Sequence, residues 1–283
     1  MARLFGLLGN RADFAGRVLR VEADALRAHR GVPPSRRSSH PFAWGVGFYQ
    51  GGEVLLRRRP SEEAETIDFA TLVADLRADV AIGHVREATV GALRTENTHP
   101  FRYRQWLYAQ TGTLQGFDEM RPRLLESLPE FLRNDVRGET DAEVVFHVVL
   151  SFLHDSGALR SPHAEPRAFE EALRHTMQLL ETMGTEIGVP QAKVNLLMTN
   201  GEFLVALHAG EKMASRVFEG QADEDLLLGD DPSFRRKVAN PSQLRFWLLA
   251  SDFDEEPHIS WRTIPPRSIV TVTRKDGFKI RPL

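Results

Sequence analysis

Short apolar runs separated by turn residues dominate the chain and predict many β-strands. Two pairs of runs predict hairpins. One pair, 44–49 and 54–56, flanks Gly51-Gly52, and the other flanks Asn200-Gly201, a dipeptide that suits a type I′ turn. The strands of the second pair are predicted at Val194–Met198 and Phe203–Leu207. The remaining strands are predicted at Leu4–Leu8, Val80–Arg86, Trp106–Gln110, Leu244–Ala250, Trp261–Ile264 and Ser268–Val272.

Apolar residues recur at helical spacing in several other segments. Helices are predicted at Phe14–Arg27, Asp68–Leu76, Arg121–Leu132 (interrupted by Pro122 and Pro129), Val144–Leu153 and Ala168–Met183. Thr140 followed by Glu143 before an apolar run is typical of a capping box. Segments 223–231 and 232–241 are polar and predict irregular surface excursions. Strands and helices alternate without a composition break, which favours one α/β domain.

Glycines within the strand at 44–49 call for a separate interpretation. Gly45 and Gly47 lack the third glycine and the following helix of a dinucleotide-binding loop. Small residues inside a strand more often allow another segment to approach closely. We therefore expect a neighbouring segment to pack against this strand, and no phosphate site.

Composition narrows the function classes. The 283 residues carry a net charge of −3, which argues against a general nucleic-acid binder. No apolar run is long enough to span a membrane, and the start of the chain lacks the form of a signal peptide, so we expect a cytoplasmic protein. The chain has no cysteine, which excludes disulfides, thiolate metal sites and cysteine nucleophiles. Histidine spacing predicts no metal site, and no cofactor is expected.

Two predicted strands finish in polar segments able to do chemistry. The strand at 80–86 ends in His84-Val85-Arg86, and the strand at 106–110 leads into Thr111-Gly112-Thr113. Functional side chains commonly lie at such strand ends and the loops that follow. These two segments are therefore the first candidates for a site.

Short motifs in a fixed order give a family resemblance. They are Met1-Ala2-Arg3-Leu4-Phe5-Gly6, Ala43-Trp44-Gly45-Val46-Gly47, His84-Val85-Arg86-Glu87-Ala88-Thr89, Asn97-Thr98-His99-Pro100-Phe101, Thr140-Asp141-Ala142-Glu143, and, near the end, Ala250-Ser251-Asp252 with Trp261-Arg262-Thr263-Ile264-Pro265. In this order the chain resembles the class II glutamine amidotransferases, which have the N-terminal-nucleophile (Ntn) hydrolase fold. It is most similar to their small stand-alone branch, which includes the ergothioneine-pathway amidohydrolase. The resemblance covers nearly the whole chain.

The resemblance implies a four-layer αββα sandwich, with two mostly antiparallel sheets between helical layers, and a single domain over 1–283. In the family, removal of the initiator Met exposes a Cys whose thiol attacks the glutamine amide while its own α-amine serves as the base. An Asn side chain and the next Gly N–H form the oxyanion hole. An Arg binds the substrate carboxylate and an Asp binds its ammonium group.

Carried onto this chain, the substrate-binding positions are Arg86, Thr89 nearby, Asp141 and His99. Each has a plainer interpretation: Arg86 as an ion-pair residue, Asp141 as a charge favoured at a helix N-terminus, and His99 as a structural hydrogen-bonding residue. The expected small molecule is glutamine or a γ-glutamyl compound. Any ammonia acceptor or partner protein would be a separate chain, and no contact with nucleic acid or membrane is expected.

The catalytic positions depart from the family. Ala2 occupies the nucleophile position and has no thiol, and the oxyanion segment is Gln110-Thr111-Gly112, in which only the Gly112 N–H can be kept. Two separate departures favour natural loss of activity over a laboratory substitution at Ala2. We therefore expect a protein without glutaminase activity. The alternatives are a weak or repurposed amidohydrolase that uses the α-amine of Ala2 as base, helped by Thr111 or Thr113, and a structural or assembly module.

Overall fold

The computed structural model describes residues 3–26, 42–61, 73–87, 91–161, 164–189, 191–229, 243–253 and 257–283. Its strands are β1 (Arg3–Gly9), β2 (Phe42–Gln50), β3 (Glu53–Ser61), β4 (Val80–Glu87), β5 (Phe101–Tyr103), β6 (Trp106–Thr111), β7 (Asn195–Thr199), β8 (Phe203–His208), β9 (Met213–Glu219), β10 (Arg245–Ser251), β11 (Arg262–Thr263), β12 (Ser268–Thr273) and β13 (Gly277–Pro282). Its α-helices are α1 (Ala15–Val21), α2 (Ala23–Leu26), α4 (Phe117–Ser127), α5 (Glu130–Arg133), α6 (Asp141–Asp155), α7 (Pro166–Glu186) and α8 (Gln221–Leu228).

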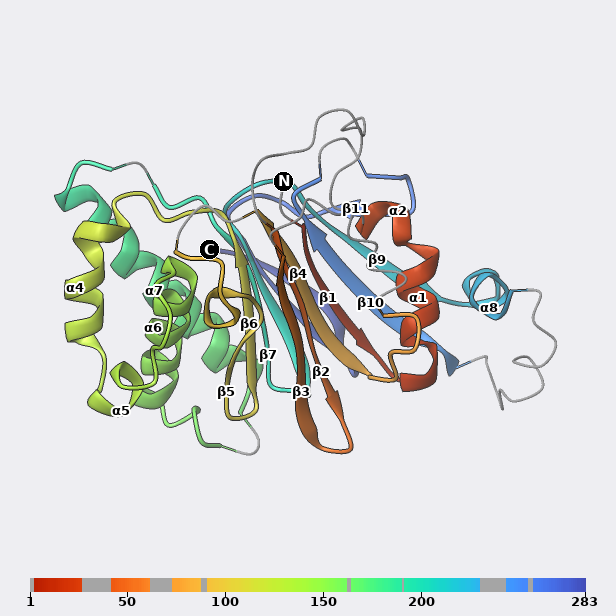
Figure 1. The fold of residues 1–283 in the computed structure, drawn as a ribbon. Coiled ribbons are helices and arrows are strands. Elements are labelled where there is room, and N and C mark those ends of the chain that lie inside the picture. Colours follow the sequence, from red (N-terminus) through yellow and green to blue (C-terminus); the bar gives the residue numbers. More distant parts are fainter. Residues whose placement is uncertain are drawn as a thin grey trace, which may run out of the picture.

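Two antiparallel sheets stack face to face between helical layers (Figure 1). Within the described residues, the seven-stranded sheet has the order β11-β9-β10-β1-β4-β2-β3, and the six-stranded sheet has the order β13-β12-β8-β7-β6-β5. Helices α4 to α7 cover the outer face of the six-stranded sheet, and α1, α2 and α8 lie on the opposite side of the molecule (Figure 1). The four-layer αββα architecture expected from the resemblance is confirmed.

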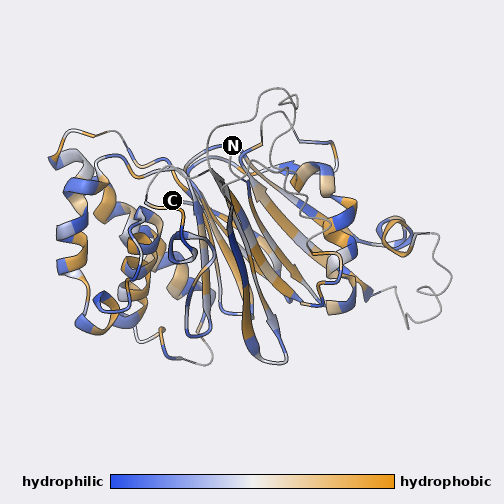
Figure 2. Ribbon diagram, in the orientation of Figure 1, coloured by the Kyte–Doolittle hydropathy of each residue, from blue (hydrophilic) through white to orange (hydrophobic). Residues whose placement is uncertain are grey.

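Hydrophobic residues form the interfaces between these layers. Figure 2 shows them gathered on the strands and on the helix sides that face the sheets. Every residue of β1 is buried, because its two faces serve different cores. Leu4 and Leu8 pack between the sheets, whereas Phe5 and Leu7 pack in the cluster that also holds α1. An apolar strand buried on both faces must be central in its sheet, so the sequence of β1 fixes its place.

Close approach explains the glycine in β2. A Cβ on Gly45 would lie 2.1 Å from the backbone oxygen of His99. The expectation that another segment packs against this strand is thus confirmed, and that segment is the loop leading into β5. Its His99 side chain contacts the ring of His84 from β4, with centroids 4.4 Å apart.

The helix predictions needed several corrections. The helix predicted at 14–27 is broken at Glu22, whose carboxylate accepts a hydrogen bond of 2.8 Å from the Trp261 indole. Pro122 lies inside α4 without interrupting it, whereas Pro129 does separate α4 from α5. Most of the helix predicted at 68–76 lies outside the described residues, and 73–75 form a turn.

Loop predictions also changed. Segment 223–231 was expected to be irregular, but 221–228 form α8, which buries Leu227 and Leu228. Segment 232–241 lies outside the described residues. The hairpin at Asn200-Gly201 is confirmed, but its turn is not type I′, because only Gly201 has a positive φ. The Asn200 side-chain oxygen instead accepts hydrogen bonds from the Glu202 and Phe203 N–H groups.

Capping of α6 follows only half of the predicted box. The Thr140 hydroxyl accepts a hydrogen bond from the Glu143 N–H, as predicted. The Glu143 carboxylate, however, accepts from the N–H groups of Arg137 and Gly138 rather than from that of Thr140. It thereby fixes the loop that precedes the helix, and with it the position of Asp141.

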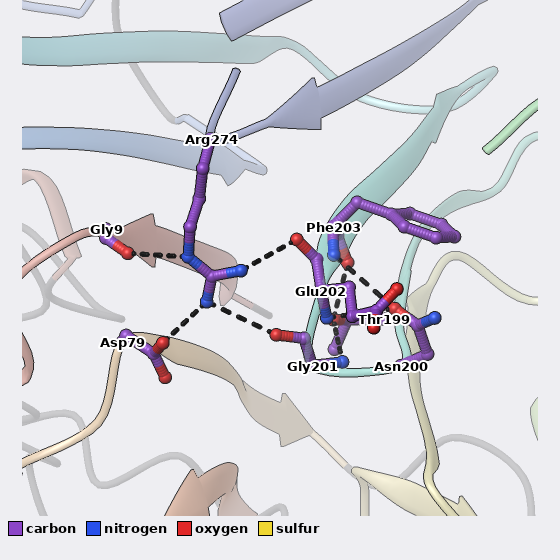
Figure 3. A network of polar contacts seen from close by, with 8 residues as sticks. All are labelled: Gly9, Asp79, Thr199, Asn200, Gly201, Glu202, Phe203 and Arg274. Atoms are coloured by element: carbon purple, nitrogen blue, oxygen red, sulfur yellow. Dashed lines mark hydrogen bonds and ion pairs between the residues drawn. The ribbon is translucent and has the colours of Figure 1, made fainter. Parts of the chain in front are cut away.

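One arginine joins the two sheets at the edge where β1 ends (Figure 3). The guanidinium of Arg274, just after β12, donates to the backbone oxygens of Gly9, Gly201 and Glu202 and pairs with Asp79 at 2.6 Å. These partners belong to the end of β1, the β7–β8 turn and the segment before β4.

Within the ranges given above, no helix is long and apolar enough to cross a membrane.

Candidate functional site

Four strands and one helix bring polar residues to the edge where β1 begins. In the seven-stranded sheet, Leu4 at the start of β1 pairs with Ser251 at the end of β10, and Arg3 pairs with Val85 near the end of β4. Thr111 ends β6 in the other sheet, and its hydroxyl bonds to Asp252 across the sandwich. The predicted strand ends therefore meet at one edge.

Asp252 is the centre of the polar contacts at this edge. Its Oδ2 accepts a hydrogen bond of 2.9 Å from the Thr111 hydroxyl and another from the Ser251 hydroxyl. Its backbone N–H donates to the Lys212 oxygen at 2.9 Å. The residue has a φ of 63°, a left-handed conformation that is uncommon outside glycine and that often marks functional sites.

The surroundings of Asp252 shift its proton affinity. Burial raises the pKa of its carboxyl above the ordinary value, while the hydrogen bonds from Ser251 and Thr111 and the charge of Arg3 act in the opposite direction. Arg3 itself is buried, donates from Nη1 to the Ser251 oxygen at 2.9 Å, and lies over the Phe253 ring. The carboxylate is thus desolvated, a state associated with functional sites.

Asp252→Asn is expected to be more stable than the wild type near neutral pH, by a difference that shrinks as the pH falls. A raised pKa means that the folded state holds this proton more tightly than the unfolded state, whose pKa is near 3.8. Protonated Asp252 stabilises the folded state fully at pH values below the unfolded-state pKa. This stabilisation is lost as the pH rises through the folded-state pKa. Asparagine avoids this cost and tolerates a positive φ. Urea unfolding at several pH values measures the difference.

Asp276→Asn serves as the control. The hydrogen bond from Lys279 lowers the pKa of the exposed Asp276, so here the wild type should be the more stable protein near neutral pH. If the wild type were more stable than Asp252→Asn by a difference that grows towards neutral pH, the raised pKa of Asp252 would be contradicted.

Gly112, one of the two predicted oxyanion residues, has a conformation that requires glycine. Its φ is 86°, and a Cβ there would lie 2.2 Å from the Lys193 backbone oxygen. The glycine therefore lets the β6 end pass close to the chain before β7. Thr111, its neighbour, faces Asp252, whereas Gln110 accepts a hydrogen bond from the Tyr108 hydroxyl on the other face of β6.

Asp141 begins α6 on the helical side of β6. Its Oδ2 accepts a hydrogen bond of 2.7 Å from the Leu114 N–H and its Oδ1 one of 2.9 Å from the Ala142 N–H. These contacts hold the carboxylate at a helix N-terminus, where negative charge is favoured. They also join the helix to the segment that follows Gly112.

The other predicted site residues are placed less completely. Ala2 and Thr89 lie outside the described residues. Arg86 belongs to β4, where its backbone pairs with Ala43, and its side chain is not described. His99 is buried between the rings of His84 and Phe101. Their roles in binding stay predictions.

The sequence assigned no role to Arg3, Ser251 or Asp252. A signal was present, because Ser251-Asp252 follows an apolar strand, as do the polar segments after β4 and β6. No group of three or more His, Asp or Glu side chains among the described residues is arranged to hold a metal ion.

Comparison with known proteins places the chain in a family. The model of the class II glutamine amidotransferases matches residues 17–278, and the chain belongs to this family. A relative from Saccharomyces cerevisiae, named "Probable glutamine amidotransferase DUG3", is 24% identical over 273 residues, which cover 88% of this chain and 73% of that protein.

Two solved structures share the fold. A glutamine aminotransferase class-II domain protein from Silicibacter pomeroyi has a TM-score of 0.61 and 18% identity, with 99% of both chains covered. Glutamine phosphoribosylpyrophosphate amidotransferase from B. subtilis has a TM-score of 0.56 and 16% identity, and the match covers 99% of this chain but 49% of that one. The Ntn-type fold expected from the sequence motifs is confirmed.

Proposed function

We propose that this chain is a class II glutamine amidotransferase-like protein that lacks cysteine-dependent glutaminase activity and binds glutamine or a γ-glutamyl compound. The observation that carries the proposal is Ala2 at the nucleophile position in a chain without any cysteine. A methyl group has no lone pair to attack an amide and no proton to give up. The covalent route of the family therefore has no starting group here.

The contact between Thr111 and Asp252 supports the same conclusion. Thr111 lies where the family has the oxyanion-stabilising Asn, and its hydroxyl donates to a carboxylate 2.9 Å away. A donor engaged in this way is turned from a developing oxyanion, and the neighbouring carboxylate would repel that charge. Loss of one such donor costs about 3–4 kcal/mol of transition-state stabilisation.

Binding of the amino-acid headgroup is assigned to Arg86 and Asp141. The N–H groups of Leu114 and Ala142 fix the Asp141 carboxylate, whose negative charge would attract a ligand ammonium. Arg86, the third residue of the motif that begins at His84, would offer a planar pair of donors to a carboxylate. A positive and a negative group together match the zwitterionic end of an α-amino acid.

Isothermal titration calorimetry with glutamine tests this proposal. We expect millimolar or tighter binding that weakens at least about tenfold in Arg86→Ala, because a charge-assisted bidentate contact is lost. Arg102→Ala, at an exposed position of β5, is the matched control and should bind as the wild type does. The same samples should release no ammonia above background.

Two results would overturn the proposal. Absence of glutamine binding at millimolar concentration, or binding unchanged in Arg86→Ala, would remove the headgroup site and favour a structural or assembly module. Ammonia release that is abolished by blocking the N-terminus would instead favour an amidohydrolase with the Ala2 α-amine as base.

A further inference from the structure

The Asp252 carboxylate has one committed oxygen and one open oxygen. Oδ2 accepts both hydroxyl hydrogen bonds, from Thr111 and Ser251. In the part of the chain that the structure describes, Oδ1 accepts no hydrogen bond and Asp252 forms no ion pair. Asp252 as a whole residue is partly exposed, although protein surrounds most of its carboxylate.

Two unfavourable features coincide at this residue. The backbone is held at a φ of 63°, and the carboxylate is surrounded by protein. Left-handed backbone at a non-glycine residue and burial of a carboxylate that lacks an ion pair each cost stability. A ligand that supplies a positive charge or N–H donors would offset the cost of burying the carboxylate.

Among the described residues, the charges of Arg3 and Glu211 act on Asp252. Arg3 is the close cation, but its guanidinium donates to the Ser251 oxygen and lies over the Phe253 ring. The Glu211 carboxylate also acts on Asp252. The open oxygen therefore belongs to a carboxylate whose close cation already has other contacts. A ligand carboxylate would be repelled there, and a ligand ammonium would be attracted.

The position of Thr111 relates this carboxylate to the proposed amino-acid site. In the proposed function Thr111 takes the oxyanion position, where the side chain of a bound glutamine would react, and its hydroxyl donates to Asp252. This end of the site therefore presents the Asp252 carboxylate, a hydrogen-bond acceptor, in place of a donor to a ligand oxygen. The preferred side-chain end is thus a donor group, and the best one is cationic.

We propose that Asp252 binds the side-chain ammonium group of a basic α-amino acid, so that the site prefers ornithine to glutamine. Ornithine carries its terminal nitrogen at the same number of bonds from the α-carbon as glutamine does. The inference rests on the proposed function, because it assumes that Arg86 and Asp141 bind the shared headgroup. It adds the identity of the side chain.

Calorimetry with ornithine, glutamine and glutamate tests the inference, since the three differ chiefly in their terminal group. We expect the order ornithine, glutamine, glutamate from tight to weak, with at least about a tenfold step between ornithine and glutamine. Asp252→Asn keeps a hydrogen-bond acceptor and tolerates the positive φ, and it should reduce that step to less than about threefold. Asp276→Asn, which removes an exposed carboxylate after β12, should leave the order and the step unchanged.

Each outcome decides a different point. Glutamine binding as tightly as ornithine would overturn the inference and leave the proposed function standing. An ornithine preference that survives in folded Asp252→Asn would overturn the role of Asp252. Binding of none of the three ligands by the wild type would overturn both the inference and the proposed function. Melting temperatures of the variants show that they are folded.

Discussion

The Ala2→Cys, Thr111→Asn double variant is expected to release ammonia from glutamine about 10²–10³ times faster than Ala2→Cys alone. The single change restores a thiol beside a terminal amine, provided that Met1 is removed. It leaves the oxyanion end of the site with the Gly112 N–H and a hydroxyl that donates to Asp252. The second change supplies an amide N–H donor, whose removal in a comparable site costs that factor in rate.

A coupled ammonia assay on both variants measures the difference, and intact mass establishes that the terminal Met is absent. Thr113→Asn in the Ala2→Cys background is the matched control, because it adds the same amide two positions away, at an exposed residue. It should give no gain. Equal rates for the double variant and the control would contradict the assignment of Thr111 to the oxyanion position.

The second large effect concerns stability. Gly112→Ala is expected to destabilise the protein by about 3 kcal/mol or more, because the new methyl would lie 2.2 Å from the Lys193 oxygen and 3.1 Å from the Val194 Cα. Both contacts are with backbone, so no side chain can move aside. The positive φ adds a further cost of about 1–2 kcal/mol for any residue with a Cβ.

Gly188→Ala separates the two contributions. Gly188 also has a positive φ, 72°, but nothing lies within 4 Å of the position its Cβ would take. It should therefore lose only the conformational part, about 1–2 kcal/mol. Urea unfolding of both variants measures the free energies. Similar losses in the two would show that the chain before β7 can retreat from Gly112.

Much of the fold could be read from local pattern. An apolar run such as β1, buried on both faces, identifies a central strand whatever surrounds it. Segment 223–231 was misjudged because its acidic residues hide the apolar side that α8 buries. The turn after β7 was misjudged because the dipeptide alone does not fix how many residues the strands leave unpaired. Pairing in the sheet decides that number.

The sequence by itself determined the family, the sandwich architecture and the absence of a nucleophilic cysteine, since these depend on residue identity and on motif order. Only the tertiary structure brought Thr111 to Asp252, 141 residues apart along the chain. Hydrophobic period encodes which face of a strand is buried, but not which strand ends meet when two sheets stack. That stacking places the Asp252 carboxylate beside the Thr111 hydroxyl and gives the proposed site the charge on which its proposed ligand depends.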